Sequence, residues 1–273
     1  MSLDLDTRQR AMLDEMGVKV WWPGGAEVPA RAVNPVPASV SILAAEARQG
    51  TAAFAPPAAL PSGSAAHLDW PALQQAVAGC QACGLCATRK NTVFGVGQAP
   101  VAPDSAPQVD WLVVGEAPGE NEDLQGEPFV GAAGKLLDNM LKAMGCNRHQ
   151  NVYIANVLKC RPPDNRNPAP EEIAQCAPYL HRQVALLRPK IILAMGRFAV
   201  QALLADSVPD VATIPLGKLR GKVYAYHGVP VVVTYHPAYL LRSLADKAKA
   251  WADLCLGLAV VAQAQADDAG RMS

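Results

Sequence analysis

The sequence lacks any apolar run that approaches the roughly 18 residues of a membrane-spanning helix, which excludes an integral membrane protein. The first ten residues, MSLDLDTRQR, also lack the apolar core of a signal peptide, so we expect none. An excess of either charge is missing too, since 24 Lys and Arg balance 24 Asp and Glu. This balance excludes a globally basic nucleic-acid binder but leaves room for a local basic patch. We expect a soluble, monomeric protein of the cytoplasm without a membrane partner.

Lysine is absent between residues 23 and 69, a stretch of 47 residues that contains 7 Pro and 14 Ala. This Ala/Pro-rich composition, without sustained periodicity, predicts a flexible linker over residues 23–69. The whole chain is 51% hydrophobic, so the remainder can bury a large core. We expect one globular domain over residues 70–265 and a tail over residues 266–273.

Residues 1–22, ahead of this linker, are predicted to be a unit of their own. Residues 6–16 have the pattern of a short helix, and the aromatic pair Trp21 and Trp22 follows in VKVWWP. A short helix with an aromatic tail at the end of a tether indicates a partner-docking peptide. Two alternatives stay open: the peptide folds back onto the globular domain, or it stays disordered.

Four short runs of Val, Ile and Leu at successive positions predict strands that are buried on both faces. They lie at residues 111–116, 152–158, 190–196 and 229–236. Helical patterns lie between or after them, at residues 132–145, 170–187 and 243–261. Strands that alternate with helices predict an α/β fold, a three-layer sandwich around a central, mostly parallel four-stranded sheet.

Each predicted strand runs into a polar or glycine-rich segment. These segments are GEAPGENED, NVLKCRPPDNRNP, GRFA and HPAYLLR. Ligands of such folds bind beyond the carboxyl ends of the strands, so we expect these segments to face one crevice.

The seven cysteines of a cytoplasmic protein are expected to be metal ligands or free thiols rather than disulfides. Cys80 and Cys83 form a C-x2-C pair, and Cys160 and Cys176 follow far along the chain. Four such thiolates suit an iron–sulfur cluster or a zinc ion, and spacing does not choose between them. Cys86 makes a second C-x2-C with Cys83, so both registers stay open on spacing. Unligated, packed thiols are the other alternative.

Four separated blocks, in order, resemble the family 4 uracil-DNA glycosylases, the iron–sulfur branch of that superfamily. The blocks are CQACGLCATRKNTVFGVG, VGEAPGENEDLQGEPFVGAAGKLLDNML, VYIANVLKCRPPDNRNPAPEEIAQCAPYL and VVVTYHPAYLLR. The resemblance covers residues 75–260. It implies an enzyme that flips uracil out of DNA and hydrolyses its N-glycosidic bond, leaving an abasic site for base excision repair in the bacterial cytoplasm and nucleoid. It also implies that Cys80, Cys83, Cys160 and Cys176, not Cys86, hold a [4Fe–4S] cluster, with zinc as the alternative.

The resemblance assigns the uracil-binding residues. Asn156 lies in an otherwise apolar run, and a buried amide needs a partner, which the N3–H and O4 of uracil provide. Phe129 is expected to stack on the flipped base, and His236 to donate a hydrogen bond to the departing uracil anion. Gly115 and Ala117, with small or absent side chains, let the backbone approach the base closely.

Acidic residues after the first predicted strand are expected to assist the reaction. Ala117 stands where other branches carry an Asp base, so Glu116 and Glu122 are the predicted groups for charge stabilisation and water positioning. Asn165 is a weaker candidate for holding the water. No basic, His-containing insertion follows the CRPP motif, so we expect turnover rather than covalent trapping of the product.

DNA contacts are expected from residues 218–249, which hold six Lys and Arg against one acid. Lys218, Arg220 and Arg242 are predicted phosphate contacts. Tyr239, Leu240 and Leu241 are candidates for an apolar wedge in the duplex, although the two leucines also fit a helix core.

Residues 1–22 are weakly similar to the N-terminal segment of the clamp-loader psi subunit, which docks on the chi subunit. This likeness implies the replication machinery as a partner beside uracil-containing DNA. The competing interpretation of the domain is a non-catalytic iron–sulfur module that binds nucleic acid. Glu116, Asn156 and His236 together argue against it, because a pure binder does not need all three.

Overall fold

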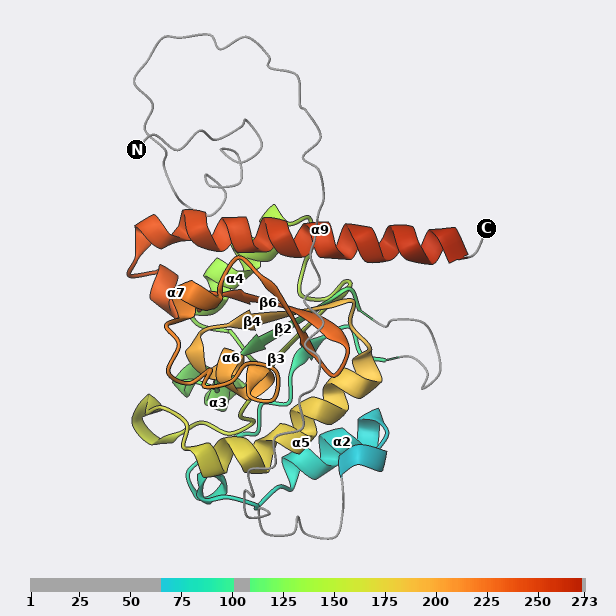
Figure 1. Ribbon diagram of the computed structural model, residues 1–273. Coiled ribbons are helices and arrows are strands. Elements are labelled where there is room, and N and C mark those ends of the chain that lie inside the picture. The colour runs from blue at the N-terminus through green and yellow to red at the C-terminus, as the bar shows by residue number, and fades with distance from the viewer. Residues whose placement is uncertain (1–64, 101–108, 272–273) are drawn as a thin grey trace, which may run out of the picture.

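The computed structural model describes residues 65–100 and 109–271, drawn in colour in Figure 1. The docking peptide predicted for residues 1–22, and the linker as far as residue 64, lie outside the described residues. The division of the chain into these units therefore stays a prediction. None of the helices in the described part is long and apolar enough to cross a membrane.

All four predicted strands form, and they make the parallel centre of one sheet. They are β2 (Trp111–Gly115), β3 (Val152–Asn156), β4 (Ile191–Met195) and β6 (Val229–Thr234), in the spatial order β3-β2-β4-β6. The register pairs Trp111 with Val152 and Gly115 with Asn156, so the carboxyl ends of β2 and β3 lie side by side. The predicted α/β sandwich is confirmed.

Two short antiparallel strands extend this sheet at its edges, β1 (Val96–Gly97) beside β3 and β5 (Val223–Tyr226) beside β6. The apolar pattern did not predict them. β1 has two residues, and β5 alternates between exposed and half-buried positions, so neither contains an apolar run. The sheet thus has six strands in the described part of the chain.

Alternate residues of the parallel strands face two separate cores. Trp111 and Val113 of β2 pack in one core with α4 (Ala132–Ala143) and α9 (Lys247–Arg271). Leu112 and Val114 pack in the other, with α5 (Pro170–Leu187) and α6 (Arg197–Leu204). Figure 1 shows the resulting three layers, with α4 and α9 above the sheet and α5 and α6 below it. Burial on both faces explains why these strands are continuously apolar.

Helices α4 and α5 follow the predicted patterns closely, but the last helix, predicted over residues 243–261, differs at both ends. It spans Lys247–Arg271 and so includes most of the predicted tail, residues 266–273. The α4 stripe of Leu137, Met140, Leu141 and Met144 is buried, and Gly145 (φ +78°) follows its end. The last helix begins at Lys247, because residues 244–246 form a 3-10 turn, η4, instead. Leu244 is 62% exposed and is not part of the core.

The remaining helices are short or lie at the periphery. Helix α2 (Trp70–Ala78) is capped by Asp69, whose Oδ1 accepts a hydrogen bond from the Ala72 N–H, and it packs against α5. The others are η1 (Ala65–His67), η2 (Gly84–Ala87), α3 (Glu120–Gln125), η3 (Pro163–Asn165), α7 (Leu216–Leu219), α8 (Pro237–Leu240) and η4 (Leu244–Asp246).

Candidate active site

The ends of β2 and β3 bring three of the predicted base-binding residues into contact. A Cβ atom at Gly115 would lie 2.4 Å from Asn156 Oδ1 and 2.6 Å from Phe129 Cζ. A real Cβ never approaches so closely, so only glycine fits between the amide and the ring. Glycine at this strand end therefore allows Asn156 and Phe129 to converge from separate segments of the chain.

Asn156 holds a buried acceptor that has no partner among the described residues. Its side chain is 2% exposed, and its Oδ1 is completely buried without a hydrogen bond. An unpaired buried acceptor costs about 1–3 kcal/mol, and such groups are rare in folded proteins. The position therefore suits a ligand that donates a hydrogen bond.

Phe129 is held in a strained conformation against this amide. It has a φ of +57° and is 6% exposed. Arg148 donates hydrogen bonds from Nη1 to the Pro128 carbonyl (3.2 Å) and from Nη2 to the Phe129 carbonyl (3.0 Å). Gly134 of α4 lies against the Phe129 backbone so closely that a Cβ atom there would overlap it. Positive φ in a bulky residue is uncommon and marks a conformation that its surroundings impose.

His236 closes the site from the end of β6. Its ring centroid lies 5.4 Å from that of Phe129. Nδ1 accepts a hydrogen bond from the Ala238 N–H (3.2 Å), so the neutral ring carries its hydrogen on Nε2. Burial lowers the pKa of His236 to about 4; Glu122 opposes this shift and Arg242 adds to it. The imidazole is therefore neutral near pH 7 and retains one N–H donor.

Glu116 directly follows Gly115 and is half-buried. Burial raises the pKa of its carboxyl to about 6. The backbone around it is bonded to the segment after β3, since the Gly115 carbonyl accepts from the Val157 N–H and the Glu116 carbonyl from the Leu158 N–H, both at 3.0 Å. This carboxyl changes its charge within the pH range in which most enzymes work.

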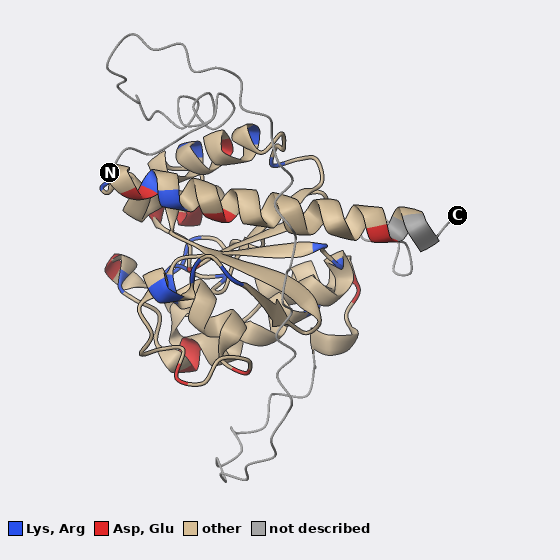
Figure 2. Cartoon of the chain, turned by 45° about the horizontal axis from the view of Figure 1, so that its top comes forward, with Lys and Arg blue, Asp and Glu red and all other residues tan. Residues whose placement is uncertain are grey.

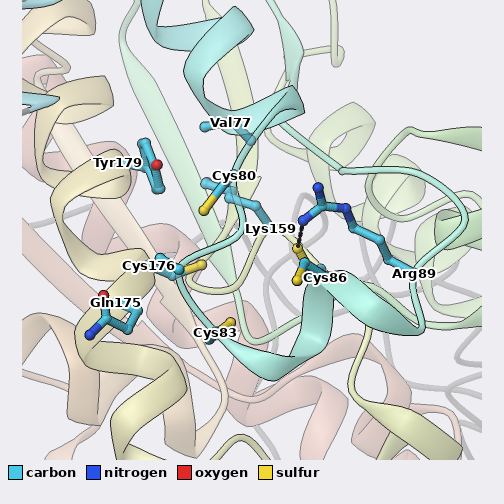
Figure 3. Close-up of a pocket in the computed structure, with 11 residues that line it drawn as sticks. Val77, Cys80, Cys83, Cys86, Arg89, Lys159, Gln175, Cys176 and Tyr179 are labelled. Atoms are coloured by element: carbon cyan, nitrogen blue, oxygen red, sulfur yellow. Dashed lines mark hydrogen bonds between the residues drawn. The ribbon is translucent and has the colours of Figure 1, made fainter. Parts of the chain in front are cut away.

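Five cysteines line one pocket beside α5, which contributes Cys176 to it (Figure 3). They are Cys80, Cys83, Cys86, Cys160 and Cys176. Burial raises the pKa of Cys83, Cys160 and Cys176, so their thiolates need positive charge nearby. Cations are present: Arg89 Nη1 donates to Cys160 Sγ (3.1 Å), and Lys159 lines the same pocket.

The cysteines do not form a compact site for a single metal ion. Within residues 65–100 and 109–271, no three His, Cys, Asp or Glu side chains are grouped as the ligands of one ion. The pocket nevertheless gathers thiols from three separate segments, as both predicted registers require. Ala117, two residues after Gly115, packs against the buried cluster that contains Cys160 and Cys176. The cysteine pocket and the base-binding residues are therefore neighbours.

Comparison with known proteins assigns this arrangement to a family. The model of the family described as the uracil DNA glycosylase superfamily matches residues 102–255, more than half of the chain. The chain belongs to the uracil-DNA glycosylase superfamily.

Several curated members of the superfamily are similar to this chain. It is 46% identical over 166 residues to the type-4 uracil-DNA glycosylase of Archaeoglobus fulgidus, covering 59% of this chain and 78% of the relative. It is 44% identical over 174 residues to that of Sulfurisphaera tokodaii (62% and 74%). It is 39% identical over 193 residues to that of Pyrobaculum aerophilum (69% and 93%).

Glu122 has a structural task in this superfamily member that the sequence did not reveal. Its Oε2 accepts from the Gly119 N–H (3.1 Å), and its Oε1 accepts from the N–H groups of Val130 (3.1 Å) and Gly131 (3.4 Å). Glu122 thus ties the loop after β2 to the segment that carries Phe129. The only sequence signal was a carboxylate three residues after Gly119, the capping-box spacing at the start of α3.

Asn165 lies on the exposed turn η3, where its Oδ1 accepts a hydrogen bond from Arg161 Nε (2.8 Å). Arg161 in turn lies 3.9 Å from Glu120, in an exposed ion pair. Through Arg161, Asn165 is therefore linked to Glu120 at the start of α3. The water-positioning role of Asn165 stays a prediction.

Two residues predicted to contact DNA have side chains that are used inside the protein. Leu240 is completely buried in the core with α4, so it is not free to enter a duplex. Arg220 is mostly buried and donates from Nε to Asp253 Oδ2 at 2.6 Å, while its guanidinium covers the Tyr235 ring at 4.5 Å. Asp253 is 1% exposed, so Arg220 neutralises a buried carboxylate.

The other predicted DNA contacts lie on the surface. Leu241 is 43% exposed and Tyr239 is 38% exposed, although the Tyr239 hydroxyl donates to Asp246 Oδ2 (2.6 Å). Lys218 and Arg242 are exposed as well. Lys247 and Lys249 stand in the first turn of α9, which follows this surface, and Figure 2 shows blue segments at that end of the helix.

Proposed function

We propose that the chain is a uracil-DNA glycosylase, which binds uracil flipped out of DNA and hydrolyses its N-glycosidic bond to leave an abasic site. The superfamily assignment and the type-4 relatives support this proposal. The observation that carries it is the unpaired Oδ1 of Asn156, buried beside Phe129 and next to Gly115. That acceptor fits a flipped base that presents an N–H group.

Asn156 reads the base by its hydrogen-bonding pattern. Its Oδ1 accepts from uracil N3–H and its amide nitrogen donates to O4, whereas cytosine presents the inverse pattern. Cytosine therefore leaves buried polar groups unpaired, at a cost of about 1–3 kcal/mol. Phe129 stacks on the ring of the base, which adds about 1–3 kcal/mol. Gly115 and Ala117 leave room for the base at the strand ends.

His236 and Glu116 act on the charges that develop as the glycosidic bond breaks. Negative charge grows on the departing uracil, and the neutral His236 donates its Nε2–H to it without burying a second charge. Positive charge grows on the sugar, and the Glu116 carboxylate stabilises it and orients a water for attack. Glu122 contributes through position, since it holds the loops that carry these groups, and through its charge near His236.

Cys80, Cys83, Cys160 and Cys176 are the residues that would hold a [4Fe–4S] cluster. When bound, the cluster supplies a covalent link between these segments and α5. The donor set fits, because four thiols from three segments line one pocket together with Arg89 and Lys159, which offset negative charge. The ligands of a cluster bind different irons and stand farther apart than those of one ion. The resemblance to the iron–sulfur branch of the superfamily supports a cluster over zinc.

Leu241 is the wedge that we assign, since it is exposed next to the site while Leu240 is buried. Arg242 and Lys218 are the assigned phosphate contacts, with Tyr239 beside them. An apolar side chain that enters the stack offsets the cost of extruding the base.

Residues 1–22 are proposed to dock on the replication machinery, on the basis of their helical pattern and aromatic tail. The test compares the full chain with a variant that lacks residues 1–25 in a pull-down of replication proteins. Loss of association with full glycosylase activity supports docking, and unchanged association refutes it.

The deciding experiment for the function is an assay with oligonucleotides that contain a single uracil. Wild type is expected to release free uracil and leave an abasic site. Asn156→Asp removes the amide donor and is expected to lose the preference for uracil over cytosine, while Asn139→Asp, an exposed position of α4, serves as the matched control. Binding of the oligonucleotide without release of uracil would instead identify a non-catalytic nucleic-acid-binding module.

A further inference from the structure

Lys159 is a fully buried lysine that connects the cysteine pocket to the base-binding residues. Its side chain is 1% exposed, and it lines the pocket of cysteines shown in Figure 3. Its Nζ donates to the Asn156 carbonyl and to Gln183 Oε1, both at 2.7 Å. A completely buried lysine is rare unless its charge is paired.

The pocket that Lys159 lines contains five cysteines and, among the described residues, no carboxylate. The two hydrogen-bond acceptors of its Nζ, the Asn156 carbonyl and Gln183 Oε1, are neutral. A buried charge without a counter-charge is strongly destabilising. The thiols provide that counter-charge only as thiolates, which is the form in which they bind metal.

The other end of this connection is the residue that reads the base. Asn156 and Lys159 are three residues apart, and the Lys159 ammonium holds the Asn156 carbonyl from inside the protein. The Asn156 side chain, 2% exposed, has Oδ1 next to Gly115 and Phe129. Because the interior is close-packed, a shift of this backbone moves the amide relative to the base.

Gln183 fixes the second side of the Lys159 ammonium. Its Nε2 donates to the Phe94 carbonyl (2.9 Å), and the Phe94 neighbour Val93 donates its N–H to the Lys159 carbonyl (2.8 Å). Gln183 itself is 0% exposed on α5, seven residues after Cys176. The ammonium is therefore held between α5 and the end of β3.

We propose that Lys159 is a positioning residue that couples the metal-bound cysteines to uracil recognition by Asn156. The inference rests on the proposed function. Thiolates of the loaded site hold the Lys159 ammonium in place, and the ammonium holds the Asn156 backbone so that Oδ1 meets N3–H of uracil. Loading of the site is thus expected to sharpen discrimination of the base and not only to stabilise the fold.

The experiment uses the full chain purified anaerobically, as wild type, Lys159→Met and Lys159→Arg. Lys190→Met, which removes a partly buried lysine paired with Asp110 (2.8 Å) near the opposite end of the sheet, is the control. Measured quantities are iron and zinc per protein, the rate of metal loss to a chelator, kcat/KM on a uracil oligonucleotide, and inhibition by free uracil and by N3-methyluracil. The methyl compound lacks the N3–H donor for Asn156 Oδ1.

For Lys159→Met we expect faster metal loss than in wild type, and a preference for uracil over N3-methyluracil reduced about tenfold, the effect of one hydrogen bond. Lys159→Arg keeps the positive charge but cannot make both short hydrogen bonds, to the Asn156 carbonyl and to Gln183. Metal loss is therefore expected to stay slow, while the preference for uracil over N3-methyluracil falls. Lys190→Met should match wild type in both readouts. If Lys159→Met does not fold, the Arg variant decides by the same two readouts.

A double-mutant cycle separates coupling from general damage. If Lys159 acts through Asn156, adding Lys159→Met to Asn156→Ala should lower kcat/KM no further than Asn156→Ala alone. Additive losses, or an unchanged uracil preference in both Lys159 variants, overturn the proposal. A wild-type protein that releases no uracil overturns the proposed function itself, and the inference with it; metal retention then shows separately whether Lys159 supports the cysteine site.

Discussion

Replacing Gly115 by alanine is a direct test of whether β2 and β3 build one base-binding site. The new Cβ atom would lie 2.4 Å from Asn156 Oδ1 and 2.6 Å from Phe129 Cζ, so these contacts must lengthen by about 1 Å to reach an ordinary 3.4 Å. Phe129 has little room, because Gly134 and Arg148 hold its backbone. The amide therefore takes most of the displacement.

The expected loss follows from that displacement. Overpacking of a core costs about 1–3 kcal/mol of stability, and a misplacement of about 1 Å in a catalytic site costs about 10²-fold in rate. For Gly115→Ala we expect a modest fall in the thermal midpoint and a fall of about 10²-fold in kcat/KM for uracil release.

The assay pairs thermal unfolding with uracil release from a single-stranded oligonucleotide, which removes the cost of opening a duplex. Gly217→Ala is the control, because its Cβ would make only an ordinary contact, 3.6 Å from the Tyr235 hydroxyl. Gly115→Ala with the kcat/KM of wild type would refute the convergence of Asn156 and Phe129 on this glycine. A loss of stability equal to that of a core mutant, with kcat/KM unchanged, would refute it as well.

Three further predictions concern titration, charge and the wedge. Uracil release should rise as the pH increases through about 6, because Glu116, whose pKa burial raises to about 6, must lose its proton to act; Glu116→Gln should flatten that limb of the pH–rate profile. Arg220→Met should cost about 3–5 kcal/mol in urea unfolding, because it leaves a buried carboxylate unpaired. Lys218→Met should leave stability unchanged and reduce by about 1 the slope of log K for DNA binding against log salt concentration. If Arg220→Met instead reduced this slope and left stability unchanged, Arg220 would be the phosphate contact and its structural role would be refuted. Leu240→Ala should cost about 2–5 kcal/mol of stability, whereas Leu241→Ala should spare stability and slow excision from duplex more than from single strands; equal slowing on both substrates would count against the wedge.

The two parts of the site are connected through β3 and the segment that follows it. Asn156 ends this strand and Cys160 stands four residues later, so the base-binding amide and a predicted metal ligand belong to one short run of backbone. Lys159 lies between them and is bonded to the Asn156 carbonyl. A metal site in this place bears on the precision of the base pocket as well as on the stability of the domain.

The sequence by itself determined the features that depend on neighbouring residues. Continuous apolar runs predicted the four central strands, and a 3.6-residue period predicted α4 and much of α9, since burial on two faces or on one stripe leaves a local pattern. Glycine and asparagine at the strand ends also stood out locally, because each is unusual in a buried run.

Only the tertiary structure decided which polar and apolar side chains are used internally. Nothing local distinguishes Arg220 from Lys218, or Leu240 from Leu241, yet one member of each pair is bonded or packed inside the protein and the other is exposed. The bonds of Lys159 to Gln183 and of Arg220 to Asp253 join residues 24 and 33 positions apart. Such contacts follow from how helices and strands pack, and a pattern that spans one helical turn or one strand carries no record of them.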